Sequence, residues 1–183
     1  MNLKPTFIVI QNSLILTHKT ITKSLIGGIQ MSCIFNVVAP FATHVEDEAF
    51  ENQKVIRYVY MPMLTDAGNH SFSCCKNLRQ IVGVNLKTIG AYAFEGCYNL
   101  ERINIQNVQQ LNSNLLSYCG LTKLVSNCSS ISTSVHVIDG NEQLTQLDLP
   151  NVTEFNTAVL CGCCNIQQIR MPKLKKLIGD LPD

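Results

Sequence analysis

Cysteine and histidine are the residues of this sequence whose side chains could perform chemistry. Nine cysteines and four histidines occur among 183 residues. A cysteine nucleophile needs a histidine base beside it in space, and a structural zinc site needs paired Cys or His ligands. The densest cysteine cluster, Cys161 to Cys164, is accompanied neither by a second C-x-x-C pair nor by a paired-histidine motif. We therefore predict no catalytic residue, no metal ligand and no cofactor.

The other motifs agree with this prediction. The sequence contains no P-loop, G-x-S-x-G, H-E-x-x-H or G-x-G-x-x-G motif. We interpret His44, His70 and His136 as solvated or capping residues near turns. The chain is therefore predicted not to be an enzyme. An enzyme built on an unrecognised cysteine is the alternative, and alkylation that leaves every activity intact would argue against it.

Composition and charge exclude several classes of protein. Apolar residues make up 46% of the chain and charged residues 15%, and the net charge is +1. A disordered chain would be more charged and less apolar, and a protein that grips nucleic acid by bulk charge would be strongly basic. No window approaches the run of about 20 apolar residues that spans a membrane. The apolar run after Lys4 is broken at Gln11 to Ser13 and lacks a clear cleavage site, so we expect the cytoplasm rather than the cell surface.

The cysteines also reveal a repeat. Cys75, Cys97, Cys119 and Cys163 fall in one column at multiples of 22 residues, and Asn141 takes the remaining place. Buried free cysteine behaves as a small hydrophobic side chain. We therefore interpret this column as a ladder of packed, mostly reduced thiols rather than as a reactive site.

Apolar residues recur with the same period in three further columns. One column holds Phe50, Phe72, Phe94, Leu116, Ile138 and Leu160, and its neighbour holds Ala49, Ser71, Ala93, Leu115, Val137 and Val159. A third column holds Val45, Ala67, Ile89, Leu111, Thr133, Phe155 and Leu177. A single coil cannot bury such residues alone, so the coils must stack on one another.

The period predicts an α/β solenoid of about seven 22-residue coils. Within each coil, the pattern Leu-x-x-Ile-x-Ile alternates as a short strand with one buried face does. Parallel strands should line the concave face, with turns, short helical segments or a second strand near residues 87–89 on the convex face. Residues 1–32 are a divergent first coil or an N-terminal cap, and residues 33–183 are the solenoid. Residues 121–136 are a degenerate coil, either bulged or a local loop, because Leu121 arrives one residue early.

The segment from Leu86 to Ile105 closely resembles the BspA-like leucine-rich repeat. That family's pattern is Ile-Gly, then Ala-Phe-x-Gly-Cys, then Leu-x-x-Ile-x-Ile or Leu-Pro, and this segment carries all three parts. The chain departs from the pattern where Ala-Phe is replaced by Leu115-Leu116 and by Val159-Leu160. The resemblance implies a scaffold with roles in surface adhesion and protein binding, and no shared catalytic residues.

The solvent-facing residues of the predicted strands are the candidate binding residues. Aromatic and arginine side chains are favoured as interface anchors. The candidate protein-binding residues are Tyr58, Tyr60, Arg102, Asn104, Asp148 and Arg170. The plainer interpretation is that these are ordinary exposed strand residues.

Together these features predict a non-enzymatic, protein-binding leucine-rich-repeat module that uses its concave strand face. The expected partner is a protein of unknown identity, and neither nucleic acid binding nor membrane insertion is expected. The alternative is a fragment of a longer structural repeat array with no independent binding function. The sequence stops inside a coil, and an uncapped coil exposes a strand edge, so we also expect self-association through the C-terminal coil.

Overall fold

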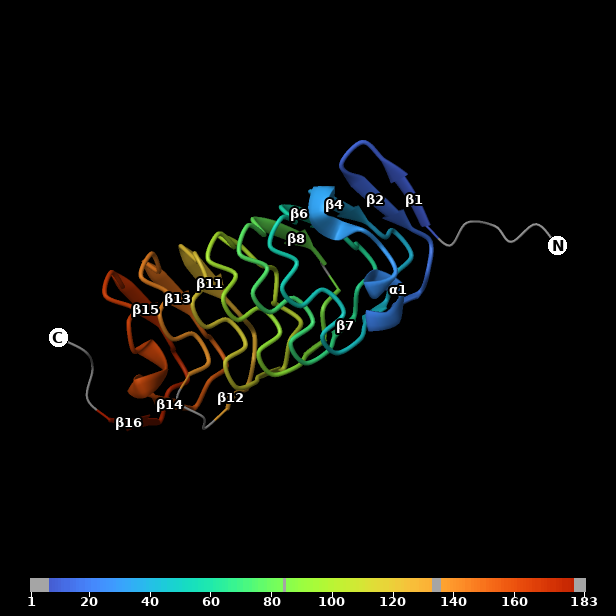
Figure 1. Cartoon of the computed structure of the whole chain (residues 1–183). Helices are drawn as coiled ribbons and strands as arrows, with labels where there is room; N and C mark the ends of the chain where they lie inside the picture. The colour runs from blue at the N-terminus through green and yellow to red at the C-terminus, as the bar shows by residue number, and fades with distance from the viewer. Residues whose placement is uncertain (1–6, 84, 133–135, 180–183) are drawn as a thin grey trace.

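The chain forms an elongated solenoid whose coils stack along one axis (Figure 1). The computed structural model describes residues 7–83, 85–132 and 136–179. Short strands dominate each coil and helix is scarce. The predicted leucine-rich-repeat solenoid is therefore confirmed, with a smaller helical part than an α/β fold usually has.

One strand from most coils lies along the upper side of the stack in Figure 1, and we call these the front strands. A typical front strand buries its middle residue and exposes the two beside it, as Val59 does between Tyr58 and Tyr60. The first group pairs in parallel in the order β2 (Ser13–Leu16), β4 (Asn36–Val38), β6 (Tyr58–Tyr60) and β8 (Gln80–Val82). The second group is β11 (Lys123–Val125), β13 (Gln146–Asp148) and β15 (Gln168–Arg170). Strand β1 (Phe7–Ile10) pairs antiparallel with β2 and extends the first group.

A second strand follows the front strand in most coils, and we call these the side strands. They pair in parallel in three groups. The groups are β3 (Thr20–Ile21), β5 (His44–Val45), β7 (Asp66–Ala67) and β9 (Thr88–Ile89); β10 (Gln110–Leu111) and β12 (Ser130–Ile131); and β14 (Glu154–Asn156) and β16 (Lys176–Ile178). Strand β9 confirms the second strand predicted near residues 87–89.

Within residues 7–83, 85–132 and 136–179, helical structure is limited to three short segments. The helix α1 (Lys23–Gly27) begins after Thr22, whose side chain accepts a hydrogen bond from the backbone N–H of Leu25 at 3.0 Å. The 3-10 segments are η1 (Met31–Cys33) and η2 (Thr157–Leu160). A 22-residue coil with two strands leaves no length for a longer helix.

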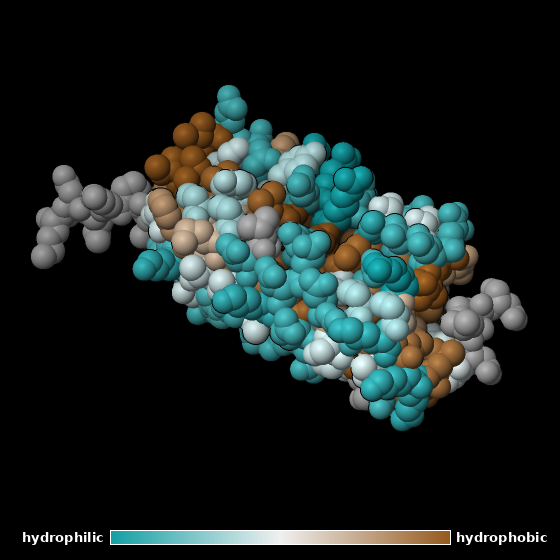
Figure 2. Space-filling view, turned by 180° about the vertical axis from the view of Figure 1, so that it is seen from behind, coloured by the Kyte–Doolittle hydropathy of each residue, from teal (hydrophilic) through white to brown (hydrophobic). Residues whose placement is uncertain are grey.

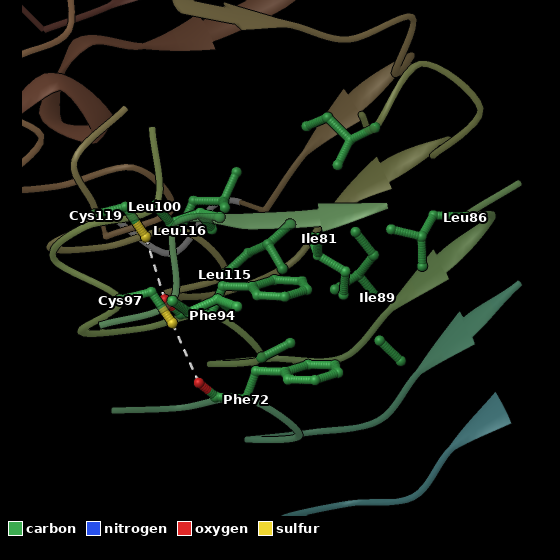
Figure 3. Packing of buried hydrophobic residues seen from close by; sticks show 14 of the residues in the cluster. Phe72, Ile81, Leu86, Ile89, Phe94, Cys97, Leu100, Leu115, Leu116 and Cys119 are labelled. Carbon is green, nitrogen blue, oxygen red and sulfur yellow. Dashed lines mark hydrogen bonds between the residues drawn. The ribbon is translucent and has the colours of Figure 1, made fainter. Parts of the chain in front are cut away.

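The predicted apolar columns form the core between the front and side strands. Phe50 stacks on Phe72 at 5.1 Å between ring centroids, and Phe72 stacks on Phe94 at 5.3 Å. These distances match the spacing of about 4.8 Å between neighbouring strands, so each ring sits above its equivalent in the previous coil (Figure 3). Every described residue of the Phe50 and Ala49 columns is buried.

The cysteine column is buried as predicted and has a hydrogen-bonding role. The thiol of Cys97 donates to the carbonyl oxygen of Phe72 at 3.2 Å, and that of Cys119 to Phe94 at 3.2 Å (Figure 3). Cys75 and Cys163 make the equivalent bond at 3.0 and 3.3 Å. Asn141 replaces the thiol in its own coil, because its amide Nδ2 donates to the carbonyl of Leu116 at 2.8 Å. Each of these side chains therefore ties its coil to the previous one.

Two sharp turns per coil use left-handed backbone at a constant spacing. In the first, Glu48, His70, Tyr92 and Asn114 have φ between 51° and 60°. In the second, glycine takes the position in three coils, at Gly96, Gly140 and Gly162, and non-glycine residues take it in three others. Glycine adopts this backbone without a steric penalty, which explains its recurrence before the ladder position.

Two predictions about the middle of the chain are wrong in detail. The column of Val45 was predicted to continue from Leu111 to Thr133, which lies outside the described residues; Ile131 pairs with Leu111 instead. The front strand that the Leu-x-x-Ile-x-Ile pattern predicts around Ile103 is reduced to one bridge, between Gln80 and Arg102. The first deviation follows from a short coil, because Leu111 and Ile131 are 20 residues apart instead of 22. The second does not, because Gln80 and Arg102 keep the 22-residue step.

The ends of the stack are more apolar at their surfaces than its middle. In the hairpin of β1 and β2, the side chains of Ile8, Val9 and Ile10 are exposed. In the last coil, Ile169 and Leu177 are exposed although they continue core columns. Figure 2 shows apolar surface, in brown, gathered toward both ends of the body.

Candidate functional site

Strand β6 places two of the predicted binding residues side by side on the front of the solenoid. Val59 points into the core, so Tyr58 and Tyr60 point outward and are 45% and 47% exposed. A shallow hollow of about 170 Å³ lies at their base and is walled by Val38 and Val82. The tyrosines therefore offer aromatic surface above an apolar floor.

The front strands are interrupted between β8 and β11 (Figure 1). A cleft lies at this interruption. Residues 102–105 lie opposite β11, but they are connected to it only at their two ends. The backbone N–H of Thr122 donates to the carbonyl of Glu101 at 3.4 Å, and the Ser126 hydroxyl donates to the carbonyl of Ile105 at 3.3 Å. Between these two ties lies a cleft of about 560 Å³.

The cleft is lined by polar and cationic side chains over a partly apolar floor. Arg102 and Lys123 lie on opposite walls, and the half-buried Ile103 and Val125 lie with them. The carboxamide of Asn104 accepts a hydrogen bond from the N–H of Gln106 at 3.2 Å, which shapes the turn after the cleft. The remaining lining residues are Gln106, Thr122, Thr145 and Gln146.

The hollow at the tyrosines and the cleft belong to one continuous groove. An intermediate hollow of about 260 Å³ shares Gln80 and Val82 with the tyrosine hollow. It shares Arg102, Ile103 and Asn104 with the cleft. We call this surface the front groove, and it crosses the strands from β4 to β13. The structure therefore brings together four predicted residues that belong to two different coils.

The other two predicted binding residues lie at the end of the front groove and beyond it. Asp148 and Arg170 form an ion pair with each other, at 3.3 Å between Oδ2 and Nη1. Their charges are thus compensated within the chain. Asp148 lies on β13, whose Gln146 lines the cleft, and Arg170 lies one coil further on, in β15.

The cationic walls of the cleft lack such compensation. Among the described residues, ion pairs join Lys23 to Glu48, His136 to Asp139, Arg170 to Asp148 and Lys176 to Glu154. Neither Arg102 nor Lys123 takes part in any of them, and both are exposed. Two unpaired positive charges therefore face one another across the groove.

Sequence reasoning missed Lys123 and the groove itself. Lys123 belongs to the same outward-facing column as Tyr58 and Arg102. The available signal was the early arrival of Leu121, which makes the step from Arg102 to Lys123 shorter than the usual 22 residues. That irregularity indicates a degenerate coil, but only the structure shows that it opens the front face.

The cysteines of the repeat column are buried core residues. Burial raises the pKa of Cys75 to about 12 and that of Cys163 to about 11, because the thiolate would lose its hydration. Burial likewise raises the pKa of Cys97 and of Cys119. Within the described ranges, no group of three His, Cys, Asp or Glu side chains is arranged to hold a metal ion. No helix in this part of the chain is long and apolar enough to cross a membrane.

Solved structures with a similar fold are bacterial leucine-rich-repeat proteins. The leucine-rich-repeat protein of T. pallidum matches with a TM-score of 0.72 and 21% identity, over 93% of this chain and 81% of that one. A leucine-rich-repeat protein from Bacteroides ovatus matches with a TM-score of 0.48 and 15% identity, over 97% of this chain and 59% of that one. The chain thus spans little more than half of the second protein. At these identities the likeness concerns the fold alone.

The sequence itself identifies the family. No curated protein sequence matches this chain. The family model described as the BspA type leucine rich repeat region matches in 6 copies, over residues 31–136 and 65–181. These matches cover most of the chain and agree with the solenoid and its columns. The chain therefore belongs to the BspA-type leucine-rich-repeat family.

Proposed function

We propose that this chain is a non-enzymatic module that binds a protein partner through the front groove. The observation that carries the proposal is the continuity of the groove from Tyr58 and Tyr60 to Arg102 and Asn104. Tyrosine and arginine dominate the binding energy of many interfaces because they combine large contact area with hydrogen bonding. Solenoids of this kind offer an extended surface on which such residues can be spaced along the axis.

The fold and the family support a binding role over a catalytic one. Leucine-rich-repeat solenoids are typically structural or binding modules. The cysteines that the sequence repeats are held in the core with raised pKa values, which keeps them as unreactive thiols. The exposed thiols of Cys33, Cys161 and Cys164 belong to no metal-binding cluster among the described residues.

The test is capture of a partner from the source cell with three forms of the full chain. The first is the wild type, and the second carries Tyr58→Ala, Tyr60→Ala and Arg102→Ala. The third is a matched control with Glu154→Gln and Lys176→Gln, an exposed pair on the side strands. We expect a partner that binds the wild type and the control but not the groove variant, with all three equally folded by circular dichroism. A partner retained by the groove variant would refute the assignment to this face.

The alternative, a section of a structural array without a partner of its own, gives a different result. It predicts that the wild type and the groove variant capture the same background. Under that account the solenoid serves as a spacer. The front groove then results from the short step between Arg102 and Lys123 and binds no partner.

The last coil favours self-association as a second property. Leu147 and Phe155 are buried, whereas Ile169 and Leu177, their equivalents one coil later, are 41% and 47% exposed. The outer edges of β15 and β16 also carry no further strand among the described residues. We infer that a second copy of the chain covers this end. Sedimentation at rising concentration should show dimers that Leu177→Lys removes, and a monomer at all concentrations would exclude the interaction.

A further inference from the structure

We propose that the front groove binds an extended acidic segment of about six residues, with a carboxylate held between Arg102 and Lys123. The segment would run along the axis of the solenoid, across the front strands rather than parallel to them. This inference rests on the proposed function and names the chemistry of the partner.

The length follows from the geometry of the stack. Between the tyrosines and its far wall, the front groove crosses five coil positions, which are marked by Tyr58, Gln80, Arg102, Lys123 and Gln146. Neighbouring strands are about 4.8 Å apart, so four steps span roughly 19 Å. An extended peptide rises about 3.3 Å per residue, and about six residues therefore cover the groove.

The negative charge proposed for the bound segment follows from the distribution of charged side chains around the front groove. The turn that leads into the front strands carries more cations, spaced by one coil, at Lys54 and Lys76 and at Arg57 and Arg79. All four are exposed, and none forms an ion pair with another described residue. Arg57 lies over the ring of Phe35 at 4.6 Å, and Lys76 lies over that of Tyr98 at 5.5 Å.

Acidic residues concentrate on a different part of the coil. They gather around the turn that follows the side strand β5, at Glu46, Asp47, Glu48 and Glu51. Near the front groove and the turn that leads into its strands, the cations outnumber the carboxylates. The cations are Lys54, Arg57, Lys76, Arg79, Arg102 and Lys123, and the carboxylates are Glu101, Glu142 and Asp148, of which Asp148 is paired with Arg170. This excess of positive charge attracts an acidic partner and orients it before contact.

A polypeptide fits this groove better than a small anion does. The floor is partly apolar, through Ile103 and Val125, and the amide side chains of Gln80, Asn104 and Gln146 can bond to a peptide backbone. The exposed rings of Tyr58 and Tyr60 add contact area at one end. A free carboxylate or phosphate would use the two cations alone and leave the rest of the groove empty.

The experiment selects ligands from a random hexapeptide library with the full wild-type chain. The selection is repeated with a variant carrying Arg102→Gln and Lys123→Gln and with Arg170→Gln as the matched control, since Arg170 is already paired. We expect Asp and Glu to be enriched by the wild type and the control but not by the double variant. The best peptide should lose at least about tenfold in affinity when its acids become amides, since each lost charged hydrogen bond is worth that much.

Competition then identifies the class of ligand. Free glutamate, inorganic phosphate and a polyuronate of equal charge should displace the peptide at least about tenfold less well than the peptide displaces itself. If glutamate or phosphate displaced the peptide as well as the peptide displaces itself, the groove would be a site for small anions. If the polyuronate displaced it more strongly, the ligand would be a polysaccharide. Either result overturns the proposal.

The outcomes also separate this inference from the proposed function. Peptides that need Tyr58 and Tyr60 but carry no acids would overturn the acidic segment and leave the binding face in place. A library that yields no peptide at all overturns the inference as well. In that case, capture of a partner by the wild type and not by the groove variant would still support the proposed function.

Discussion

The front strands before residue 100 form one continuous ladder, whereas the ladder is interrupted after it, and this difference locates the candidate site. From β4 to β8 the paired residues are 22 apart in each step, and the strands form an unbroken ladder. From Lys123 to Gln146 the step is 23, and the preceding step from Arg102 is 21. The 23-residue steps from β2 to β4 and from β11 to β13 are still fully paired. The cleft lies at the shortened 21-residue step from Arg102 to Lys123.

The core is less sensitive to this irregularity than the strands are. Leu121 and Leu124 remain buried although they arrive early, and Leu116 and Ile138 continue the phenylalanine column without a gap. Apolar packing is non-directional, whereas backbone hydrogen bonds in a ladder require a fixed register. The molecule can therefore open a groove on its surface while its core stays continuous.

The largest expected effect is the difference in alkylation rate between buried and exposed thiols. Cys75 and the exposed Cys33, Cys161 and Cys164 belong to the same chain but to different environments. A pKa raised from 9.0 to about 12 lowers the thiolate fraction of Cys75 about a thousandfold at pH 8. Alkylation followed by mass spectrometry should label the three exposed thiols first and Cys75 only on unfolding. Equal rates for all four would contradict the buried ladder.

Truncation of the regular core should have the next largest effect. Phe72 is buried and stacked on both sides, so Phe72→Ala should lower the free energy of unfolding by about 3–5 kcal/mol. Ile103→Ala, at the half-buried floor of the cleft, should cost about 1–2 kcal/mol. Denaturation in urea measures both. The contrast between regular and irregular coils would fail if Ile103→Ala cost as much as Phe72→Ala.

Asn141 offers a smaller test of the ladder. Its Nδ2 donates to the carbonyls of Leu116 and Ile138, so Asn141→Ala should lower the free energy of unfolding by about 1–3 kcal/mol. Asn141→Cys restores a donor of the kind used in the neighbouring coils and should recover part of that loss. A cysteine variant no more stable than the alanine variant would show that the donor does not matter at this position.

The smallest effect is expected at the surface pair of β13 and β15. Arg170 is 62% exposed in its side chain, so Arg170→Ala should change the free energy of unfolding by less than about 1 kcal/mol. It should also leave binding at the front groove unchanged. Calorimetry with the selected peptide checks both statements, and a large loss of affinity would extend the site to β15.

Much of the fold could be predicted because the period repeats the same physical requirement in every coil. The columns of Phe50 and Cys75 identify the core, and alternation around Val59 identifies the front strands and the outward-facing tyrosines. The candidate site was predictable only in part. The sequence could not predict the ion pair between Asp148 and Arg170 or the opening beside Lys123, because both depend on the distance between neighbouring coils. The one-residue change in spacing shows that a coil is irregular, but it does not show which contacts between coils are lost.

Hydrogen exchange of the full chain, with and without the selected acidic hexapeptide, tests the central claim most directly. The account predicts that amides at residues 103–105 exchange at least about tenfold faster than those of β8 in the free protein, because they have left the ladder. The peptide should then slow exchange at 103–105 and in β11 but not in β15. Equal protection of 103–105 and β8 in the free protein, or protection by the peptide that is confined to other coils, would contradict the groove as the site of recognition.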